Sequence, residues 1–376
     1  MERRSGVILE NFRVEERICR ISSKGTKSAK QKSKGNTMYR ARNDLTASLG
    51  FQGFLGVVGV LAVNLLCGTF LLSGCGKSAG GGSSGAIAVQ LTLDWKPEPE
   101  FGGFYAAKQD GAFSRHGLDA TITPAGEGAD TWQLVATGKT EFATSSADQV
   151  LIARKQNADV IAIFAVYQTF PQGIMVHQSR GFKTMGDVFT NDGILLAEDN
   201  AWLHFLENKF APVRVRITYY SGGISEFLAK KEYSQQCFVT SEPILAKHQG
   251  GDPQTFLIAD EGFNPYTTVV ICKGDLWRAH PDEVKSMAAA CREGWRDYLD
   301  QPDAVNATMH GLNADMDLQT FAEAAAAQKP LIETDQTRAA GLGTMTGERW
   351  KDLADQLVKL GVIDSSVDPQ QCFVNP

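Results

Sequence analysis

Apolar and polar positions alternate in short blocks between residues 88 and 167, and the period of the alternation changes from block to block. Residues 88–93 alternate with period two, as a half-buried strand does, and 160–167 is a continuous apolar run typical of a fully buried strand. Further strands are predicted at 118–123 and 141–144, and helices at 104–113, 131–137 and 147–155. This order predicts a mostly parallel sheet with helices on both faces.

A second series of the same kind begins near residue 182. Its predicted strands are 194–197, 213–220 and 237–239, and its helices are 202–210, 224–231 and one from Pro243 onward. A β-branched strand follows at 267–272, and the chain is then predicted to be helical to its end. Pro281 fits the first turn of a long helix, and Thr346 fits the N-cap of the last one. The pattern therefore predicts two α/β units.

The front of the chain has a different pattern, an apolar run without charge over 51–72 that is followed by Cys75 in Leu-Ser-Gly-Cys. It resembles a bacterial lipoprotein signal, which implies that Cys75 is lipidated and begins the mature chain. The alternative is an uncleaved transmembrane helix, since about 20 apolar residues span a bilayer. Four glycines and two polar residues within the run weigh against that alternative. We expect 1–74 to be an N-terminal extension with the signal, and 75–87 to be a Gly/Ser linker.

Charge is divided unequally on the two sides of Cys75, with a net charge of +7 over 1–74 and −13 over 75–376. An acidic body excludes nucleic-acid binding, because phosphate contacts require clustered Lys and Arg. The other cysteines of this part form no Cys-x-x-Cys pair and no zinc-ligand spacing; they are Cys237, Cys272, Cys291 and Cys372. We therefore expect buried thiols with at most one disulfide, no metal and no cofactor.

The most specific stretch is 93–118, which begins Leu-Asp-Trp-Lys-Pro-Glu-Pro-Glu-Phe-Gly-Gly-Phe-Tyr. Together with 138–143 and 240–243 it resembles the solute-binding proteins of thiamine-pyrimidine-precursor, riboflavin and alkanesulfonate ABC importers. Fungal hydroxymethylpyrimidine phosphate synthase shares their fold. The resemblance implies the type II periplasmic-binding-protein fold, in which two doubly wound α/β lobes are joined by two crossover strands. The expected lobes are 88–178 plus 268–376, and 179–267.

The resemblance also implies a ligand site between the lobes, since ligands of such sheets bind at the carboxyl ends of the strands. Asp94 and Trp95 follow the first strand, where the carboxylate can accept an N–H of an aminopyrimidine while the indole stacks on its ring. Glu242 would face them from the second lobe. The alternatives are a turn-capping Asp94, a core Trp95 and an arginine partner for Glu242. Carboxylates with aromatic rings favour a flat nitrogen heterocycle over a sulfonate, with a flavin as a further alternative.

Other residues near strand ends are candidates for the same site. Helix capping is the ordinary structural alternative for Ser145 and Ser146. These candidates are Tyr105, Ser145, Ser146, Tyr167, Asn200, Trp202, Tyr219, Gly222, Gly223 and Tyr266.

An enzymatic function is the rival hypothesis, because the fungal synthase that shares this fold is an enzyme. It uses a lysine-bound cofactor and its own histidine. Aligned through the shared segments, those positions fall near Ser145 and Gln149, which support neither step. We expect instead a monomeric, extracytoplasmic, lipid-anchored carrier that closes over its ligand and docks on an ABC permease with a separate ATPase subunit. A lipid-anchored scaffold without a ligand is the third alternative.

Overall fold

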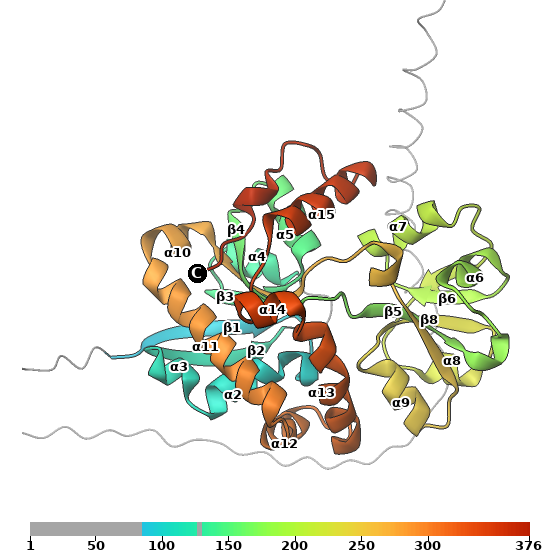
Figure 1. The fold of residues 1–376 in the computed structure, drawn as a ribbon, viewed down its shortest axis with the longest axis horizontal. Helices are drawn as coiled ribbons and strands as arrows, with labels where there is room; N and C mark the ends of the chain where they lie inside the picture. Colours follow the sequence, from blue (N-terminus) through green and yellow to red (C-terminus); the bar gives the residue numbers. More distant parts are fainter. Residues whose placement is uncertain (1–84, 126–129) are drawn as a thin grey trace, which may run out of the picture. The chain divides into compact units, whose positions relative to one another are not determined.

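The first of two β-sheets combines strands from distant parts of the chain. The structure is a computed structural model that describes residues 85–125 and 130–376. The strands of this sheet are β1 Ile87–Leu93, β2 Leu118–Pro124, β3 Phe142–Ser145, β4 Val160–Tyr167 and β10 Thr267–Lys273. Their order is β2-β1-β3-β10-β4 (Figure 1). β1 pairs in parallel with β2 and β3, whereas β10 is antiparallel to β3 and β4, so one strand runs against the other four.

The second sheet repeats this plan. Its strands are β5 Gln172–His177, β6 Ile194–Ala197, β7 Arg216–Tyr219, β8 Tyr233–Phe238 and β9 Pro253–Leu257. Their order is β7-β6-β8-β5-β9. β6 pairs in parallel with β7 and β8, and β5 is antiparallel to β8 and β9. In each sheet, the antiparallel strand is the one that follows a crossover from the other sheet, β10 in the first sheet and β5 in the second.

The chain therefore crosses between the sheets twice, through residues 168–171 and 258–266. We call the first sheet and its helices lobe 1, and the second sheet and its helices lobe 2. The second sheet begins at β5, so it includes residues that lie inside the range 88–178 expected for the first lobe. One hydrophobic cluster continues across the crossovers, with Ala165 of β4, Ile174 of β5 and Phe263 as members.

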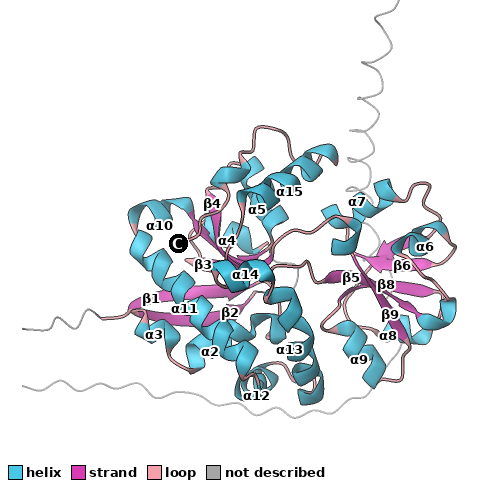
Figure 2. Cartoon of the chain, viewed as in Figure 1, coloured by secondary structure: helices cyan, strands magenta, loops and turns pink. Residues whose placement is uncertain are grey.

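Helices surround both sheets (Figure 2). Those of lobe 1 are α2 Gly102–Gln109, α3 Ala112–Arg115, α4 Thr131–Ala136, α5 Ala147–Lys155, α10 Gly274–Ala279, α11 Pro281–Asp300, α12 Asp303–Leu312, α13 Leu318–Ile332, α14 Asp335–Ala340 and α15 Gly347–Lys359. Those of lobe 2 are α6 Met185–Thr190, α7 Ala201–Lys209, α8 Ser225–Ala229 and α9 Glu242–His248. Short 3₁₀ turns are η1 Pro99–Phe101, η2 Gln178–Arg180, η3 Ala259–Glu261 and η4 Pro369–Gln371.

Most of the predicted elements are confirmed to within a few residues, including the start of α11 at Pro281 and the cap of α15, where Thr346 Oγ1 accepts the amide of Arg349 at 3.5 Å. The helix predicted at 104–113 is two helices, α2 and α3, because Gly111 adopts a left-handed φ of 76° that interrupts it. Strands β5 and β9 have no counterpart in the sequence prediction.

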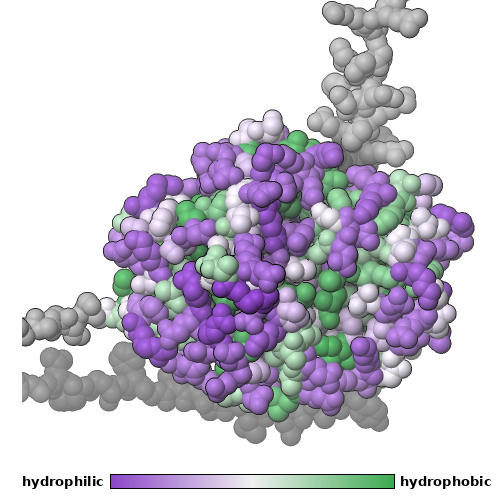
Figure 3. All heavy atoms as spheres, viewed as in Figure 1, coloured by the Kyte–Doolittle hydropathy of each residue, from purple (hydrophilic) through white to green (hydrophobic). Residues whose placement is uncertain are grey.

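Within 85–125 and 130–376 few large apolar side chains are exposed, and the face drawn in Figure 3 is mostly hydrophilic with small apolar areas. Within 85–125 and 130–376, no helix has the length and apolar character needed to cross a bilayer. All four cysteines of these ranges are buried and free, so the expected burial is confirmed and no disulfide joins them. Cys75, the apolar run 51–72 and most of the linker lie outside the described residues, and the lipoprotein signal stays a prediction.

Candidate functional site

Asp94 and Trp95 lie directly after β1, where the neighbouring strand β3 also ends. The backbone amide of Asp94 donates to Thr144 Oγ1 at 2.8 Å, and the Thr144 hydroxyl donates to Asp94 Oδ1. Burial raises the pKa of the Asp94 carboxyl above its usual value, although the Thr144 hydrogen bond opposes the shift. Trp95 is partly buried against the lobe 1 core. The two predicted side chains are thus held at one edge of the sheet.

Two further carboxyl groups, Glu98 and Glu100, follow in the same segment, and the sequence analysis did not single them out. Glu98 Oε2 accepts the hydroxyl of Ser241 at 3.3 Å, a contact that joins the two lobes. Burial raises the pKa of Glu98, and hydrogen bonds from Ser241, Trp95 and Asn313 lower it in part. Glu100 is only 8% exposed. Burial raises its pKa well above the usual value, and the nearby carboxylates of Glu98, Glu242 and Asp94 raise it further.

Glu242 is the first residue of α9 in lobe 2. Its Oε1 accepts the hydroxyl of Tyr220 at 3.2 Å, and its Oε2 accepts the amide of Phe238 at 2.8 Å. These partners, rather than an arginine, satisfy the carboxyl. Burial raises its pKa to about 7, and the charge of Glu98 adds to the shift. We call Asp94, Glu98, Glu100 and Glu242 the acid cluster, because Glu100 interacts electrostatically with the other three.

Tyr167 ends β4 at the entrance to the first crossover and is fully buried. Its hydroxyl donates to Gln328 Oε1 at 2.7 Å, and Gln328 Nε2 donates to the carbonyl of Pro99 at 2.9 Å. The ring meets Phe238 of lobe 2 edge-on, with centroids 6.3 Å apart. Burial raises the pKa of Tyr167 well above its usual value, and Glu100 adds to this. The predicted residue therefore lies beside the acid cluster and connects it to the crossover.

The other candidate residues of lobe 1 are Ser145, Ser146 and Tyr105. Ser145 is buried at the end of β3, and Ser146 precedes α5 without capping its backbone. The Ser146 side chain instead hydrogen-bonds Asp148, whose pKa is raised by burial. Tyr105 of α2 is 8% exposed, and burial raises its pKa to about 12.

Some of the candidate residues of lobe 2 lie at the surface, and others lie in the core. Asn200 precedes α7, and its Nδ2 donates to Glu198 Oε2 at 3.2 Å. Tyr219 is 74% exposed at the end of β7. The next turn holds Gly222 and Gly223, whose φ values of 88° and 74° favour glycine. Trp202 is a buried member of the hydrophobic core that continues across the crossovers.

Tyr266 of the second crossover is also a core residue, 1% exposed. Its hydroxyl accepts the amide of Thr346 at 3.0 Å, and the Arg349 guanidinium stacks over its ring at 3.9 Å from the centroid. The aromatic rings of Trp202 and Tyr266 therefore contribute to core packing.

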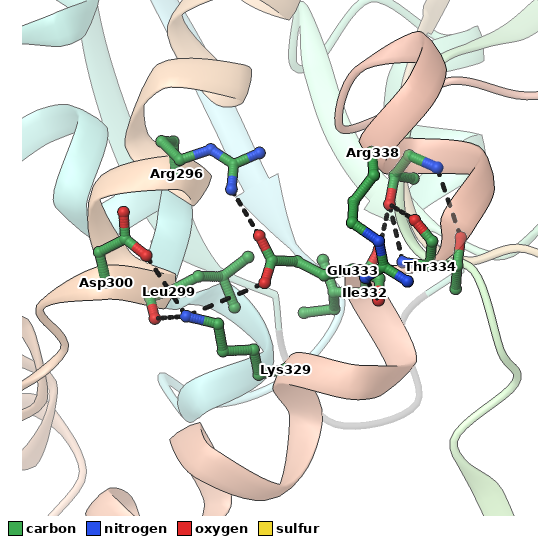
Figure 4. A network of polar contacts seen from close by, with 9 residues as sticks. Arg296, Leu299, Asp300, Lys329, Ile332, Glu333, Thr334 and Arg338 are labelled. Carbon is green, nitrogen blue, oxygen red and sulfur yellow. Dashed lines mark hydrogen bonds and ion pairs between the residues drawn. The ribbon is translucent and has the colours of Figure 1, made fainter.

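A surface cavity of about 630 Å³ lies elsewhere on lobe 1, along α13 and α14. Its charged groups are paired with one another (Figure 4). Lys329 Nζ donates to the carbonyl of Leu299 at 2.9 Å and to Asp300 Oδ1 at 3.3 Å, and Arg296 binds Glu333. These oppositely charged groups therefore neutralise one another within the protein.

Comparisons with known proteins agree with this architecture. The family model "NMT1/THI5 like" matches residues 98–189 and 228–305. The riboflavin-binding protein RibY of Chloroflexus aurantiacus is 24% identical over 308 residues, 76% of this chain and 85% of the relative. The formylaminopyrimidine-binding protein of Halalkalibacterium halodurans is 21% identical over 252 residues, 64% of this chain and 75% of the relative.

Solved structures share the fold. The periplasmic aliphatic sulphonate binding protein SsuA of Escherichia coli superimposes with a TM-score of 0.59 at 12% identity, over 77% of this chain and 92% of its own. The desulfurization enzyme DSZB superimposes with a TM-score of 0.54 at 13% identity, over 76% and 96%. The predicted type II fold is thereby confirmed. The chain is therefore similar to the NMT1/THI5 like family over residues 98–189 and 228–305, and it has the fold of the type II periplasmic binding proteins.

Proposed function

We propose that this protein is the extracytoplasmic substrate-binding component of an ABC importer and that it captures a small, flat nitrogen heterocycle between its lobes. The observation that supports the proposal is the hydrogen bond from Ser241, next to Glu242 of lobe 2, to Glu98 in the turn that follows Asp94 and Trp95 of lobe 1. Asp94 and Glu242 also both act electrostatically on the buried Glu100. Asp94 and Glu242 are 148 positions apart in the chain, and sheets of this class bind ligands at the carboxyl ends of their strands and between domains.

The chemistry of these groups suits an aminopyrimidine. A carboxyl oxygen accepts the N–H of an exocyclic amine, and a Trp95 ring stacked on the heterocycle contributes ~1–3 kcal/mol. A site built to hydrogen-bond a ligand donor rejects analogues without it by about 10⁴–10⁵. The name of the formylaminopyrimidine-binding relative supports this ligand class. Riboflavin is the second candidate, since a relative is named for binding it and an isoalloxazine ring is also flat.

A carrier function fits these residues better than catalysis. Aligned through the shared segments, the reactive lysine and histidine of the fungal synthase fall near Ser145 and Gln149, and neither side chain can replace them. In a carrier the ligand shifts the equilibrium toward the closed form, which requires tighter binding to that form than to the open one. The closed form would dock on a permease with its own ATPase subunit, and Cys75 would anchor the protein through lipid.

Calorimetric titration of the purified protein with formylaminopyrimidine and with riboflavin tests the proposal. We expect Trp95→Ala to weaken binding roughly 5- to 150-fold, the equivalent of the stacking energy, and Asp94→Asn to weaken it as well. Trp277→Ala is the matched control, since Trp277 of α10 is also a half-buried tryptophan packed on the lobe 1 core. Unchanged affinities in both site variants would refute the site, and failure of both ligands to bind would refute the ligand class.

A further inference from the structure

A polar contact between the lobes lies away from the acid cluster, at the other end of α9. His248, the last residue of α9 in lobe 2, meets the first turns of α13 in lobe 1. Its Nδ1 is 3.0 Å from Thr320 Oγ1, and its Nε2 is 3.0 Å from Glu323 Oε1. Because Ser241, directly before α9, also binds Glu98, this helix contacts lobe 1 at both of its ends.

The hydrogen bonds around His248 determine where its protons are. The Thr320 hydroxyl donates to Asp317 Oδ2 at 2.9 Å, so the hydroxyl oxygen is left to accept from His248 Nδ1. Asp317 is an acceptor because the amide of Thr320 lowers its pKa. Glu323 Oε1 is an acceptor as well, since hydrogen bonds from Gln319 and His248 lower the pKa of that carboxyl. Both ring nitrogens therefore face acceptors, which only the doubly protonated, positively charged ring satisfies.

A neutral His248 ring loses one side of this arrangement. Gln319 Nε2 lies 3.3 Å from His248 Nε2 and would donate to that nitrogen if it had no proton. The lone pair of the nitrogen would then also face the Glu323 oxygen at 3.0 Å, and the two negative partial charges repel. Gln319 Nε2 already donates to the same Glu323 oxygen, at 2.9 Å. The contact between α9 and α13 thus favours the charged ring.

The contact lies far along α13 from the crossovers. Near the end of this helix, the carbonyl of Leu331 accepts the amides of Gln168 and Thr169 in the first crossover, at 2.9 and 3.0 Å. Thr320 lies about 16 Å from Leu331 along the helix, at a rise of about 1.5 Å per residue. In a protein that opens at its crossovers, the separation grows with distance from them. Opening therefore breaks the contacts of His248 and exposes its ring to water.

We propose that His248 is a pH-dependent latch between the lobes, whose protonated ring holds α9 against α13 and whose neutral ring favours opening. A histidine changes its charge between about pH 5 and 8. Since the closed contact binds the second ring proton and the open state does not need it, the latch favours closure at low pH, and this contribution is lost as pH rises through that range. The inference goes beyond the proposed function, because the latch acts on the equilibrium between the lobes whichever ligand they hold.

Other charged groups act on the contact and on the pH response. Lys247 of α9 acts electrostatically on Glu323, and the charge of His248 acts on Asp317 of α13. Lysine and aspartate side chains do not ordinarily change charge between about pH 6 and 8. The acid cluster does respond there, since the pKa of Glu242 is about 7. The latch is therefore measured as the difference between the unaltered protein and a variant in which the acid cluster is intact.

Two measurements on the full chain test the latch. Small-angle X-ray scattering without ligand, at about pH 6 and about pH 8, follows the opening of the lobes. Calorimetric titration with formylaminopyrimidine at the same pH values measures its effect on binding. Between them, the unaltered protein should open further and should lose about 2- to 5-fold more affinity than His248→Gln, the range expected of a partly exposed ion pair.

His204→Gln is the matched control. His204 of α7 also lies against two carboxyl groups, those of Asp199 and Glu207, but both belong to lobe 2. Its replacement should leave the pH response of the unaltered protein unchanged. Glu323→Gln removes the partner in lobe 1 and should have the same effect as His248→Gln. The double variant should then lose nothing further, because the two residues form one contact.

The outcomes are distinguishable. Equal pH responses in the unaltered protein and in His248→Gln would overturn the latch, and so would additive losses in the double variant with Glu323→Gln. If formylaminopyrimidine binds at neither pH, the proposed ligand fails, and the scattering decides on the latch alone. In that case equal opening of the unaltered protein and His248→Gln between the two pH values would overturn it.

Discussion

Arg349 joins the two crossover segments, and its removal should destabilise the protein far more than removal of an ordinary surface arginine. Its Nε donates to the carbonyl of Asn264 at 2.8 Å, and its Nη2 donates to Asn264 Oδ1 at 3.0 Å and to the carbonyl of Pro265 at 3.1 Å. Its Nη1 donates to the carbonyl of Gln168 in the other crossover. Burial lowers the pKa of Arg349 to about 10, which still leaves it protonated at neutral pH.

The size of the effect follows from these contacts. A hydrogen bond to a charged group contributes about 1.5–3 kcal/mol, and the stacking of the guanidinium on Tyr266 contributes up to about 2 kcal/mol. The contributions are not additive, because water reaches some of the freed carbonyl groups. We expect Arg349→Ala to lower the free energy of unfolding by about 3–5 kcal/mol, comparable to breaking a buried charged pair. Arg349→Lys should lose less, since it keeps the charge without the planar set of donors.

Urea unfolding followed by circular dichroism measures this loss, with Arg338→Ala as the control. Arg338 binds Asp335 and the carbonyl of Glu333, and its side chain is 60% exposed. Its removal should therefore lower the free energy of unfolding by less than about 1 kcal/mol. Since 1 kcal/mol shifts the Tm of large domains by about 2–4 °C, Arg349→Ala should melt roughly 6–20 °C lower. Equal losses in the two variants would refute the role given to Arg349.

Two further predictions concern stability. The pKa of Glu242 is about 7 in the folded protein and lower in the unfolded chain, so the folded state holds the extra proton. Stability should therefore fall by up to about 3 kcal/mol as pH rises from about 4.5 to 7. Glu242→Gln should reduce the difference between urea midpoints measured at about pH 5 and pH 8, and an unchanged difference would contradict the prediction. A Cβ at Gly294 of α11 would overlap the carbonyl oxygen of Gly103 in α2, so Gly294→Ala should lower the free energy of unfolding by about 1–3 kcal/mol or more. Gly311 faces open space, so Gly311→Ala should be neutral or stabilising by up to about 1 kcal/mol. Similar urea midpoints for the two variants would show that the two helices can move apart.

The sequence predicted the elements whose hydrophobic period is long or uninterrupted. β4 is eight consecutive buried residues, and α15 has a regular apolar stripe with a threonine cap, so their patterns leave little choice. β5 and β9 escaped prediction for local reasons. β5 contains glycine and two terminal polar residues, and β9 begins at Pro253 with only two apolar residues after it. Both become strands because they pair with each other, a contact between residues some 80 positions apart that no local window contains.

The candidate site was predictable where a motif follows a strand end. Asp94 and Glu242 occupy such positions, and the structure brings them into one electrostatic neighbourhood. Glu98 and Glu100 lie in the same motif, yet a carboxyl within a Pro-Glu-Pro-Glu run is typical of a solvated turn. In the folded structure Glu100 is buried, and Glu98 is half-buried with Ser241 hydrogen-bonded to it from lobe 2. The signal that the sequence offered was the spacing of Glu98 and Glu100, two acidic residues that follow Asp94 at every second position of the Pro-Glu-Pro-Glu run.

The two halves of the site differ in how firmly they are held, and this difference favours one order of events. The turn after β1 is fixed within lobe 1 at several points: Thr144 binds Asp94, Asn313 Nδ2 donates to the carbonyl of Pro97 at 3.2 Å, and Gln328 binds the carbonyl of Pro99. Glu242 is fixed separately within lobe 2, and the Ser241–Glu98 hydrogen bond and the edge-on contact of Tyr167 with Phe238 connect the two sides. A preorganised half-site binds at lower entropic cost than one that must assemble. We therefore propose that the ligand binds to lobe 1 first and that lobe 2 adds Glu242 when it closes. Substitutions in the turn after β1 should then change affinity in the open state, while Glu242→Gln should change mainly the closing step.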